Sequence, residues 1–341
     1  MTSCGGVGIE HDVRGAARRC VSAALAGLVV VAMLAAALAA PTASADVNQA
    51  DALIYMPYGL VHFVRPQDEV DEYLAQVDSY GIGQLIFATP KVTKKGVVKL
   101  PRHNKEMLAR WSSRAAAYDA AHGAQLGITL VVPAKVKGVK GSGIDLESTV
   151  VRAQIVTGIE AALGLGIDGV QLDFEPYPTS AGYVALLEEL DAMFARAGFD
   201  GRFSVAAPAN TSRWSPSYLK RVSELLTELN PLYYDSELTT IPVYESWTEN
   251  SLAYYSANVD SATKIVPVLP SYSSNPWHRP SVENMETATS AVSTALAAGS
   301  RVNGAGIWWG YGFLMDEEGA YDGSADRAAW QASTRALSFS P

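Results

Sequence analysis

The alternation of short apolar segments with longer segments of helical periodicity constrains the fold of this chain more than any other feature. Eight segments rich in Val, Ile, Tyr and Phe are predicted to be strands, at residues 52–56, 84–89, 127–133, 169–175, 202–208, 231–235, 264–270 and 304–310. Seven segments are predicted to be helices, at residues 68–81, 104–121, 146–166, 181–198, 215–229, 281–299 and 324–339. Strands that alternate with helices form parallel βα units, and this number of strands predicts a single (β/α)8 TIM barrel. A doubly wound open sheet is the alternative, but no glycine-rich phosphate loop follows the first strand.

The first 45 residues have the layout of a secretory signal peptide. Three arginines precede an apolar run at residues 21–40, and Ala43-Ser44-Ala45 provides a small-residue cleavage site. We therefore expect a secreted protein whose mature barrel domain comprises residues 46–341. The apolar run is also long enough to span a bilayer, which leaves a retained signal anchor as the alternative. A pair of arginines before the run keeps twin-arginine export open as a second route.

Composition narrows the classes of partner and of bound group. The chain carries 35 acidic residues against 26 Lys and Arg, a formal net charge of −9, which argues against nucleic acid as a partner. Both cysteines, Cys4 and Cys20, lie within the predicted signal peptide, so the mature protein must be held by its core and not by disulfides. The histidines after the signal peptide have no metal-ligand spacing, so no metal and no cofactor is expected.

The segment GIDGVQLDFEPYP, residues 166–178, carries the strongest functional signal in the chain. Residues two apart in a strand project to the same side, so Gln171, Asp173 and Glu175 share one face. In a barrel this face points inward, and Glu175 falls at the C-terminal end of the strand, where barrel active sites form. Carboxylates in that position cost desolvation free energy unless they are paired, hydrogen-bonded or used in catalysis. The pair therefore predicts a catalytic site, with a buried ion network as the alternative.

At these residues the chain resembles the family 18 glycoside hydrolases, the chitinase family. The fourth strand of that family carries D-G-x-D-x-D-x-E, and residues 168–175 read DGVQLDFE. Four later segments are similar to the family's fifth to eighth strands, in the same order: FSVAAPAN from Phe203, LYYDSEL from Leu232, KIVPVLPSYS from Lys264 and GAGIWWG from Gly304. The resemblance implies a secreted glycosidase that cleaves β-linked N-acetylglucosamine units in chitin, peptidoglycan or the core of N-glycans.

The resemblance also implies a substrate-assisted, retaining mechanism with no enzyme nucleophile. Glu175 would protonate the departing glycosidic oxygen, and Asp173 would orient the acetamido group of the substrate, whose oxygen attacks the anomeric carbon. Tyr234 would hold that oxygen by a hydrogen bond. The remaining residues that the resemblance or the strand ends assign to substrate binding are Asp168, Gln171, Asp235, Tyr177, Tyr272 and Trp308. Other aromatic residues at strand ends, which are candidates to stack on sugar rings, are Tyr55, Tyr58, Phe87, Trp277, Trp309 and Tyr311.

Gln171 departs from the family pattern, in which most members have Asp at this position. Glutamine can hydrogen-bond but cannot take a charge, so the tuning of Asp173 is expected to differ while the acid Glu175 is retained. Spore-cortex and LysM-linked relatives carry a related Asn in this position and are hydrolases, so Gln171 is compatible with activity.

Two other functions remain open. One is a non-catalytic carbohydrate-binding barrel, although inactive family members have typically lost the acid that Glu175 provides. The other is a glycosidase of a different barrel family with a different substrate. In each case we expect a monomer that binds a carbohydrate polymer, without nucleic acid and without stable membrane insertion after signal cleavage. Basic segments at residues 91–102 and 135–141 are expected to be solvated, or to meet an anionic polymer such as cell-wall glycan.

Overall fold

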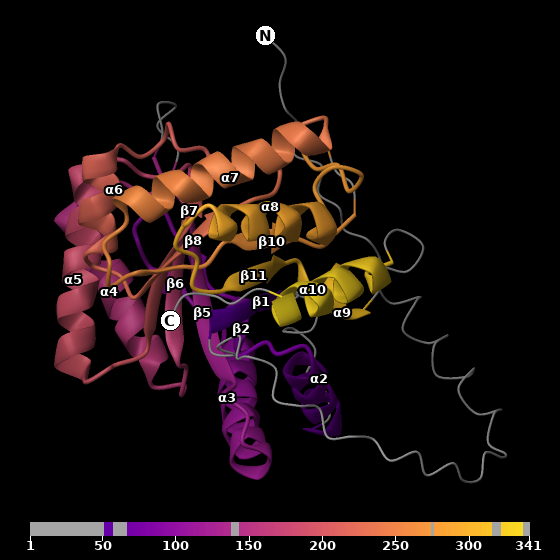
Figure 1. Ribbon diagram of the computed structural model, residues 1–341. Helices are drawn as coiled ribbons and strands as arrows, with labels where there is room; N and C mark the ends of the chain where they lie inside the picture. The colour runs from indigo at the N-terminus through magenta and orange to yellow at the C-terminus, as the bar shows by residue number, and fades with distance from the viewer. Residues whose placement is uncertain (1–50, 57–66, 138–142, 274–275, 316–321, 337–341) are drawn as a thin grey trace, which may run out of the picture. The chain divides into compact units, whose positions relative to one another are not determined.

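The computed structural model describes residues 51–56, 67–137, 143–273, 276–315 and 322–336 (Figure 1). The predicted signal peptide and Tyr58 lie outside the described residues, as does the side chain of Tyr311. Within the described part of the chain, no helix combines the length and the hydrophobicity that crossing a membrane requires.

The strands close into the predicted (β/α)8 barrel. In barrel order they are β1 (Ala52–Met56), β2 (Gln84–Ala88), β5 (Gly127–Lys135), β6 (Gly169–Glu175), β7 (Arg202–Pro208), β8 (Glu228–Leu232), β9 (Lys264–Ile265) with β10 (Val268–Pro270), and β11 (Ala305–Trp308). Neighbouring strands pair in parallel, and β10 pairs with both β8 and β11, which closes the sheet. The seventh strand position is split into β9 and β10 at Val266 and Pro267, because Pro267 has no N–H to continue the ladder.

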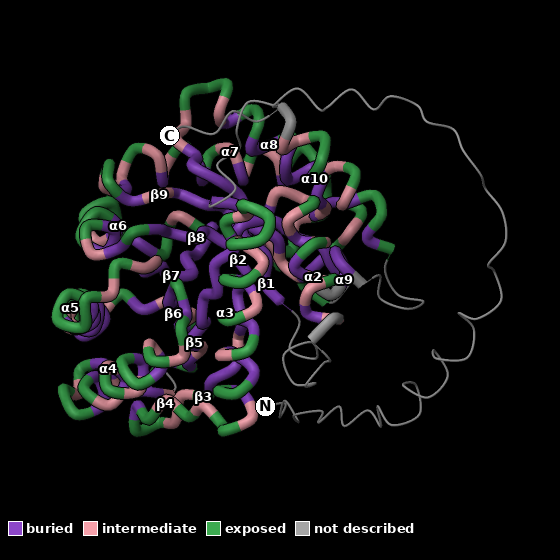
Figure 2. The backbone as a smooth tube through the Cα atoms, turned by 90° about the horizontal axis from the view of Figure 1, so that it is seen from below, coloured by how far each residue is buried: buried purple, intermediate pink, exposed green. Residues whose placement is uncertain are grey.

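Helices surround the barrel, with their buried faces toward the strands and their outer faces exposed (Figure 2). They are α2 (Gln67–Ser79), α3 (Arg102–His122), α4 (Thr149–Leu163), α5 (Ala181–Ala197), α6 (Pro216–Ser223), α7 (Ile241–Asn258), α8 (Met285–Ala297), α9 (Gly310–Met315) and α10 (Ser324–Ala336). The apolar face of β6 packs outward as predicted, and Phe174 contacts Tyr183 of α5 at 6.0 Å between ring centroids. A short hairpin, β3 (Lys91–Val92) with β4 (Val98–Lys99), occupies part of the basic segment at residues 91–102.

The helix ends follow from local sequence. The side chains of Ser148, Ser180 and Ser215 each accept a backbone N–H in the first turn of α4, α5 and α6, which satisfies an otherwise unpaired donor. Gly123 and Gly198 end α3 and α5 with φ values of 71° and 64°, a left-handed conformation that glycine adopts without a steric penalty.

The prediction was wrong for the boundary between α6 and β8. The helix predicted at residues 215–229 ends at Ser223, and the strand predicted at 231–235 begins at Glu228 and ends at Leu232. Glu228 and Asn230 are fully buried inside the barrel, so this strand carries polar side chains where an apolar pattern was sought.

Helix α7 was not predicted at all. Pro242 lies in its first turn, a position that favours helix initiation. Its buried face contains polar as well as apolar side chains, among them Thr248 and Ser251, and this mixture weakens the hydrophobic periodicity on which the prediction rests.

Paired charges fill the N-terminal end of the barrel. Lys264 Nζ lies 2.6 Å from Asp51 Oδ1, and Arg202 bridges Asp51 at 3.1 Å and also pairs with Glu228. Above this cluster, apolar side chains from several strands fill the barrel interior; they are Leu53, Tyr55, Ile86, Val131, Ala206, Leu232, Val266 and Val268. The N-terminal end is thus occupied by protein side chains, and a cavity forms at the opposite end.

Candidate active site

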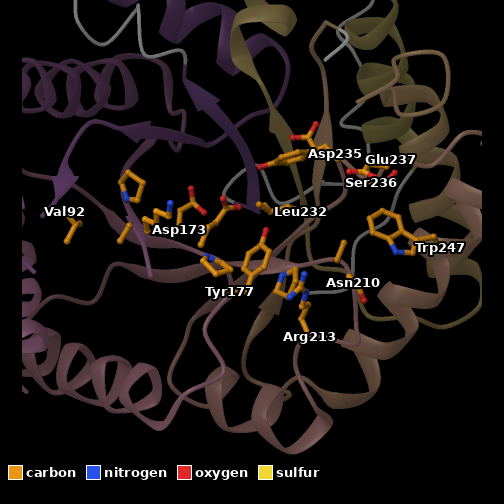
Figure 3. A pocket seen from close by; sticks show the side chains of 18 of the residues that line it. Val92, Asp173, Tyr177, Asn210, Arg213, Leu232, Asp235, Ser236, Glu237 and Trp247 are labelled. Carbon is orange, nitrogen blue, oxygen red and sulfur yellow. The ribbon is translucent and has the colours of Figure 1, made fainter. Parts of the chain in front are cut away.

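A cavity of about 1230 Å³ lies at the C-terminal ends of the strands, where the sequence predicted the site (Figure 3). Loops and strand ends after β2, β5, β6, β7 and β8 contribute to its walls, together with Trp247 of α7. Its polar and charged lining residues are Lys91, Lys135, Asp173, Glu175, Tyr177, Asn210, Arg213, Tyr234, Asp235, Ser236 and Glu237.

Asp173 and Glu175 both face this cavity from β6, as the strand periodicity predicted. Asp173 lies deeper, opposite Pro133 of β5, and Glu175 lies at the mouth, opposite Lys135. The Oδ1 atom of Asp173 is buried and accepts no hydrogen bond from the described residues. A buried acceptor without a partner costs free energy, so this oxygen is available to a donor on a bound ligand.

The two carboxyl groups hold protons at unusually high pH. Burial, and then the charge of Glu175, raises the pKa of Asp173 to about 7. Burial, and then the charge of Asp235, raises the pKa of Glu175, while a hydrogen bond from the Tyr177 hydroxyl lowers it. Because neighbouring carboxyl groups release their protons as a pair, the pair can keep a proton for acid catalysis near neutral pH.

Gln171 lies beneath Asp173 and does not line the cavity. Its Oε1 accepts a hydrogen bond from the Tyr55 hydroxyl at 2.7 Å, and its Nε2 donates to Asn230 Oδ1 at 2.7 Å. Asn230 Nδ2 in turn donates to Glu228 Oε1 at 2.8 Å, which connects Gln171 to the ion cluster at the N-terminal end. The predicted substrate contact is therefore not supported: the amide of Gln171 satisfies one donor and one acceptor of the barrel interior.

Asp168 is placed at the opposite end of β6 from the cavity. Its carboxylate accepts a hydrogen bond from the backbone N–H of Ile128 at 2.8 Å, and its own N–H donates to the Ile128 carbonyl at 2.8 Å. Glu175 lies seven positions after Asp168 along the strand, or about 23 Å away at about 3.3 Å per residue. The structure does not bring Asp168 to the site, and its contacts anchor the start of β6 against β5.

Aromatic rings form the inner wall of the cavity. Tyr234 lines it and stacks on Trp308, with ring centroids 5.2 Å apart and an angle of 12° between the planes. Tyr55 lies inside the barrel and packs edge-on against Trp308, with ring centroids 5.0 Å apart. Trp308, which was predicted to bind substrate, thus packs against Tyr234 and is not among the residues that line the cavity. Phe87 points outward and packs on Trp111 of α3 at 5.3 Å, so it takes no part in the site.

Asp235 reaches the cavity from the segment that follows β8, which we call the β8 loop and define as residues 233–238. Asp235 has a φ of 53° and Glu237 a φ of 60°, both in the left-handed region that non-glycine residues rarely adopt. The hydroxyl of Tyr272 donates to Asp235 Oδ1 at 2.6 Å. Tyr272 was predicted to bind substrate, and the structure places it beside Asp235 but outside the cavity lining.

Two buried residues outside the cavity lining, Glu283 and His278, hold the β8 loop in place. Glu283 Oε1 accepts hydrogen bonds from Ser236, from the backbone N–H at 3.1 Å and from the hydroxyl. Glu283 Oε2 lies 2.9 Å from His278 Nδ1, and the His278 ring stacks on Tyr272 at 3.8 Å. We call the contacts of Glu283 and His278 with the β8 loop and Tyr272 the clamp. Both residues are about 1% exposed, so the clamp is part of the protein interior. The clamp holds Asp235 at the position from which its charge raises the pKa of Glu175.

Among the polar, charged and aromatic lining residues, seven were not predicted to belong to the site: Lys91, Lys135, Asn210, Arg213, Ser236, Glu237 and Trp247. Asn210 ends a segment already noticed for its family resemblance, and its position after a strand could have singled it out. The lysines belong to the basic segments that were expected to be solvated or to meet an anionic polymer. Trp247 lies on α7, the helix that the periodicity did not reveal. The described residues contain no group of three or more His, Cys, Asp and Glu side chains suited to a metal ion.

Comparison with known proteins identifies the fold. The sequence matches no family model and no curated protein. A putative chitinase A of Streptomyces coelicolor is similar in structure, with 16% identity, a TM-score of 0.58 and coverage of 85% of this chain and 99% of that one. A class V chitinase of Nicotiana tobaccum gives 13% identity, a TM-score of 0.56 and coverage of 84% and 99%. The Bacillus cereus spore cortex-lytic enzyme SleL gives 11% identity, a TM-score of 0.57 and coverage of 85% and 75%. The structural neighbours are family 18 chitinases and a spore cortex-lytic enzyme, and this chain has their (β/α)8 barrel fold.

Proposed function

We propose that this protein is a secreted glycosidase that hydrolyses β-linked N-acetylglucosamine-containing glycans by substrate-assisted, retaining catalysis. The observation that carries the proposal is the joint position of Asp173, Glu175 and Tyr234, which line one cavity at the C-terminal end of the barrel. The same-fold tobacco chitinase was determined in complex with NAG4, which supports a glycan as the ligand of such a cavity.

Glu175 is the proposed general acid. Its raised pKa keeps the carboxyl protonated at higher pH than a free glutamic acid, and its place at the mouth puts it within reach of a glycosidic oxygen. The proton moves to that oxygen as the bond to the anomeric carbon breaks. After the leaving group departs, the Glu175 carboxylate takes a proton from the water that attacks the same carbon.

Asp173 and Tyr234 are the proposed partners of the acetamido group. The acetamido oxygen of the substrate attacks the anomeric carbon and closes a ring, and positive charge develops on the acetamido nitrogen. Asp173 Oδ1, which has no partner among the described residues, can accept the N–H of that group. Its negative charge then stabilises the developing positive charge, while the Tyr234 hydroxyl can orient the acetamido oxygen.

The decisive experiment is Glu175→Gln, assayed on unmodified N-acetylglucosamine oligomers, whose sugar leaving group needs protonation. Loss of general acid catalysis lowers kcat by about 10²–10⁴-fold when the leaving group needs protonation. Glu160→Gln, an exposed glutamate on α4, is the matched control and is expected to keep wild-type turnover. Aryl glycosides that lack the acetamido group should not be cleaved. Wild-type turnover in Glu175→Gln, on a substrate that the wild type cleaves, would overturn the assignment.

A further inference from the structure

Three cationic side chains line the cavity beside the acids: Lys91 of β3, Lys135 at the end of β5, and Arg213 after β7. Within the described part of the chain, none of the three forms an ion pair. Lys137, two residues after Lys135, lies outside the cavity lining and is paired with Asp145 at 2.9 Å. The lysine that faces the cavity is therefore left without a carboxylate, although its neighbour in sequence has one.

The two lysines lie on the same side of the cavity, close to the proposed acid. β2 pairs with β5, and Lys91 follows β2 while Lys135 ends β5. Lys135 is the register partner of Glu175, so the two side chains project on the same face of adjacent strands, about 5 Å apart at the backbone. A charge held by Lys135 is thus one strand away from the site of bond cleavage.

The acids of the cavity other than the β6 pair lie on the other side. Asp235 and Glu237 belong to the β8 loop, and Figure 3 shows them at the opposite end of the cavity from Val92, the neighbour of Lys91. The two lysines and the two acids of the β8 loop thus lie at opposite ends of the cavity, with Asp173 and Arg213 between them. A neutral polymer gains nothing from this arrangement, whereas a ligand that carries carboxylates is attracted toward the two lysines and repelled by Asp235 and Glu237.

We propose that Lys91 and Lys135 form a carboxylate-binding subsite, and that the preferred substrate is an N-acetylated amino-sugar polymer whose sugars carry carboxylates. This inference rests on the proposed function and specifies its substrate class. Each lysine can donate a charge-assisted hydrogen bond to a carboxylate of the glycan. The chain has a formal net charge of −9, so an anionic polymer is repelled at long range and depends on local cations to bind.

Two soluble polymers with the same backbone provide the test: carboxymethyl chitin, which is anionic, and glycol chitin, which is neutral. We expect the wild type to have the lower KM for carboxymethyl chitin. In Lys91→Ala/Lys135→Ala the ratio of KM for carboxymethyl chitin to KM for glycol chitin should rise roughly 5- to 10-fold, the effect of two partly exposed charge contacts. The rise should shrink in 0.5 M salt, because exposed charges are screened.

The matched control is Lys105→Ala/Lys220→Ala. It removes the same number of charges from exposed positions on α3 and α6 that do not line the cavity, and it should leave the KM ratio unchanged. Circular dichroism and thermal unfolding of both double variants establish that the fold is kept.

Failure of this inference and failure of the proposed function give different results. The subsite is wrong, and the glycosidase stands, if the wild type has a KM for glycol chitin that is equal to or lower than its KM for carboxymethyl chitin. The same conclusion follows if Lys91→Ala/Lys135→Ala raises the KM for both polymers by the same factor. If neither polymer is hydrolysed, the glycosidase is wrong, and calorimetric binding of the two polymers to unmodified protein decides the subsite. Tighter binding of carboxymethyl chitin that depends on Lys91 and Lys135 supports it, and equal binding overturns it.

Discussion

At the scale of single residues, Asp173 has the protonation behaviour that departs furthest from that of a free side chain. Its pKa is raised from 3.8 to about 7 by burial and by the charge of Glu175. A raised pKa in the folded state means that the protonated form stabilises the fold: this contribution is complete below about pH 4 and is lost as the pH rises through about 7. We expect Asp173→Asn, which cannot ionise, to have a higher Tm than the wild type at pH 8 and a similar Tm at pH 4. Asp191→Asn, at an exposed position on α5, should show no such pH-dependent difference, and an equal Tm offset of Asp173→Asn at both pH values would contradict the assignment.

At the scale of elements, the clamp on the β8 loop links a segment outside the cavity to the proposed acid. We expect Glu283→Ala to release Ser236, move Asp235 and so lower the pKa of Glu175, whose rise depends in part on the charge of Asp235. The basic limb of the kcat profile should then move to lower pH, because Glu175 loses its proton earlier. Tm should also fall, since removing the acceptor leaves buried donors unsatisfied at a cost of about 1–3 kcal/mol each. Glu286→Ala, at an exposed position on α8, is the control; a lower Tm of Glu283→Ala with an unshifted pH profile would mean that the clamp is structural only.

At the scale of the whole molecule, the ion cluster at the N-terminal end supports the barrel without taking part in the site. Arg202→Leu leaves Glu228 buried without its cation, and breaking a buried pair in this way costs about 3–5 kcal/mol. We expect Tm to fall by on the order of 10 °C, while kcat below the transition stays within about twofold of the wild type. Arg221→Leu removes an exposed pair with Glu188 and should change Tm little. Equal Tm changes in the two variants would show that burial of the cluster contributes nothing.

Secretion is a second prediction at this scale. The Ala43-Ser44-Ala45 site predicts a mature N-terminus at Asp46 and a mature protein without thiols, because both cysteines precede it. N-terminal sequencing and thiol titration of protein from culture medium test this. Full-length protein in the membrane fraction would favour the signal anchor.

The sequence by itself determined the features that depend on local periodicity. The alternation of strands and helices predicted the barrel, because apolar patterns with periods of 2 and 3.6 record which face of each element is buried. The same rule placed Asp173 and Glu175 on one face of β6, at the end where the cavity lies. It placed β8 three residues too late, because Glu228 and Asn230 inside the barrel are polar, and it missed α7, whose buried face is mixed.

Only the tertiary structure decided what the remaining polar residues do. Gln171 finds its partners 59 and 116 residues away, at Asn230 and Tyr55, and a strand pattern carries no information on such pairs. The motif that contains Asp168 and Glu175 runs the length of a strand, so closure of the barrel puts its two ends at opposite mouths. The clamp on the β8 loop likewise depends on how the chain between β10 and α8 folds back. Buried polar groups form hydrogen bonds with whichever groups the closed barrel brings near them. A strand or helix pattern does not record these neighbours, so only the tertiary structure showed which polar residues face the cavity and which support it.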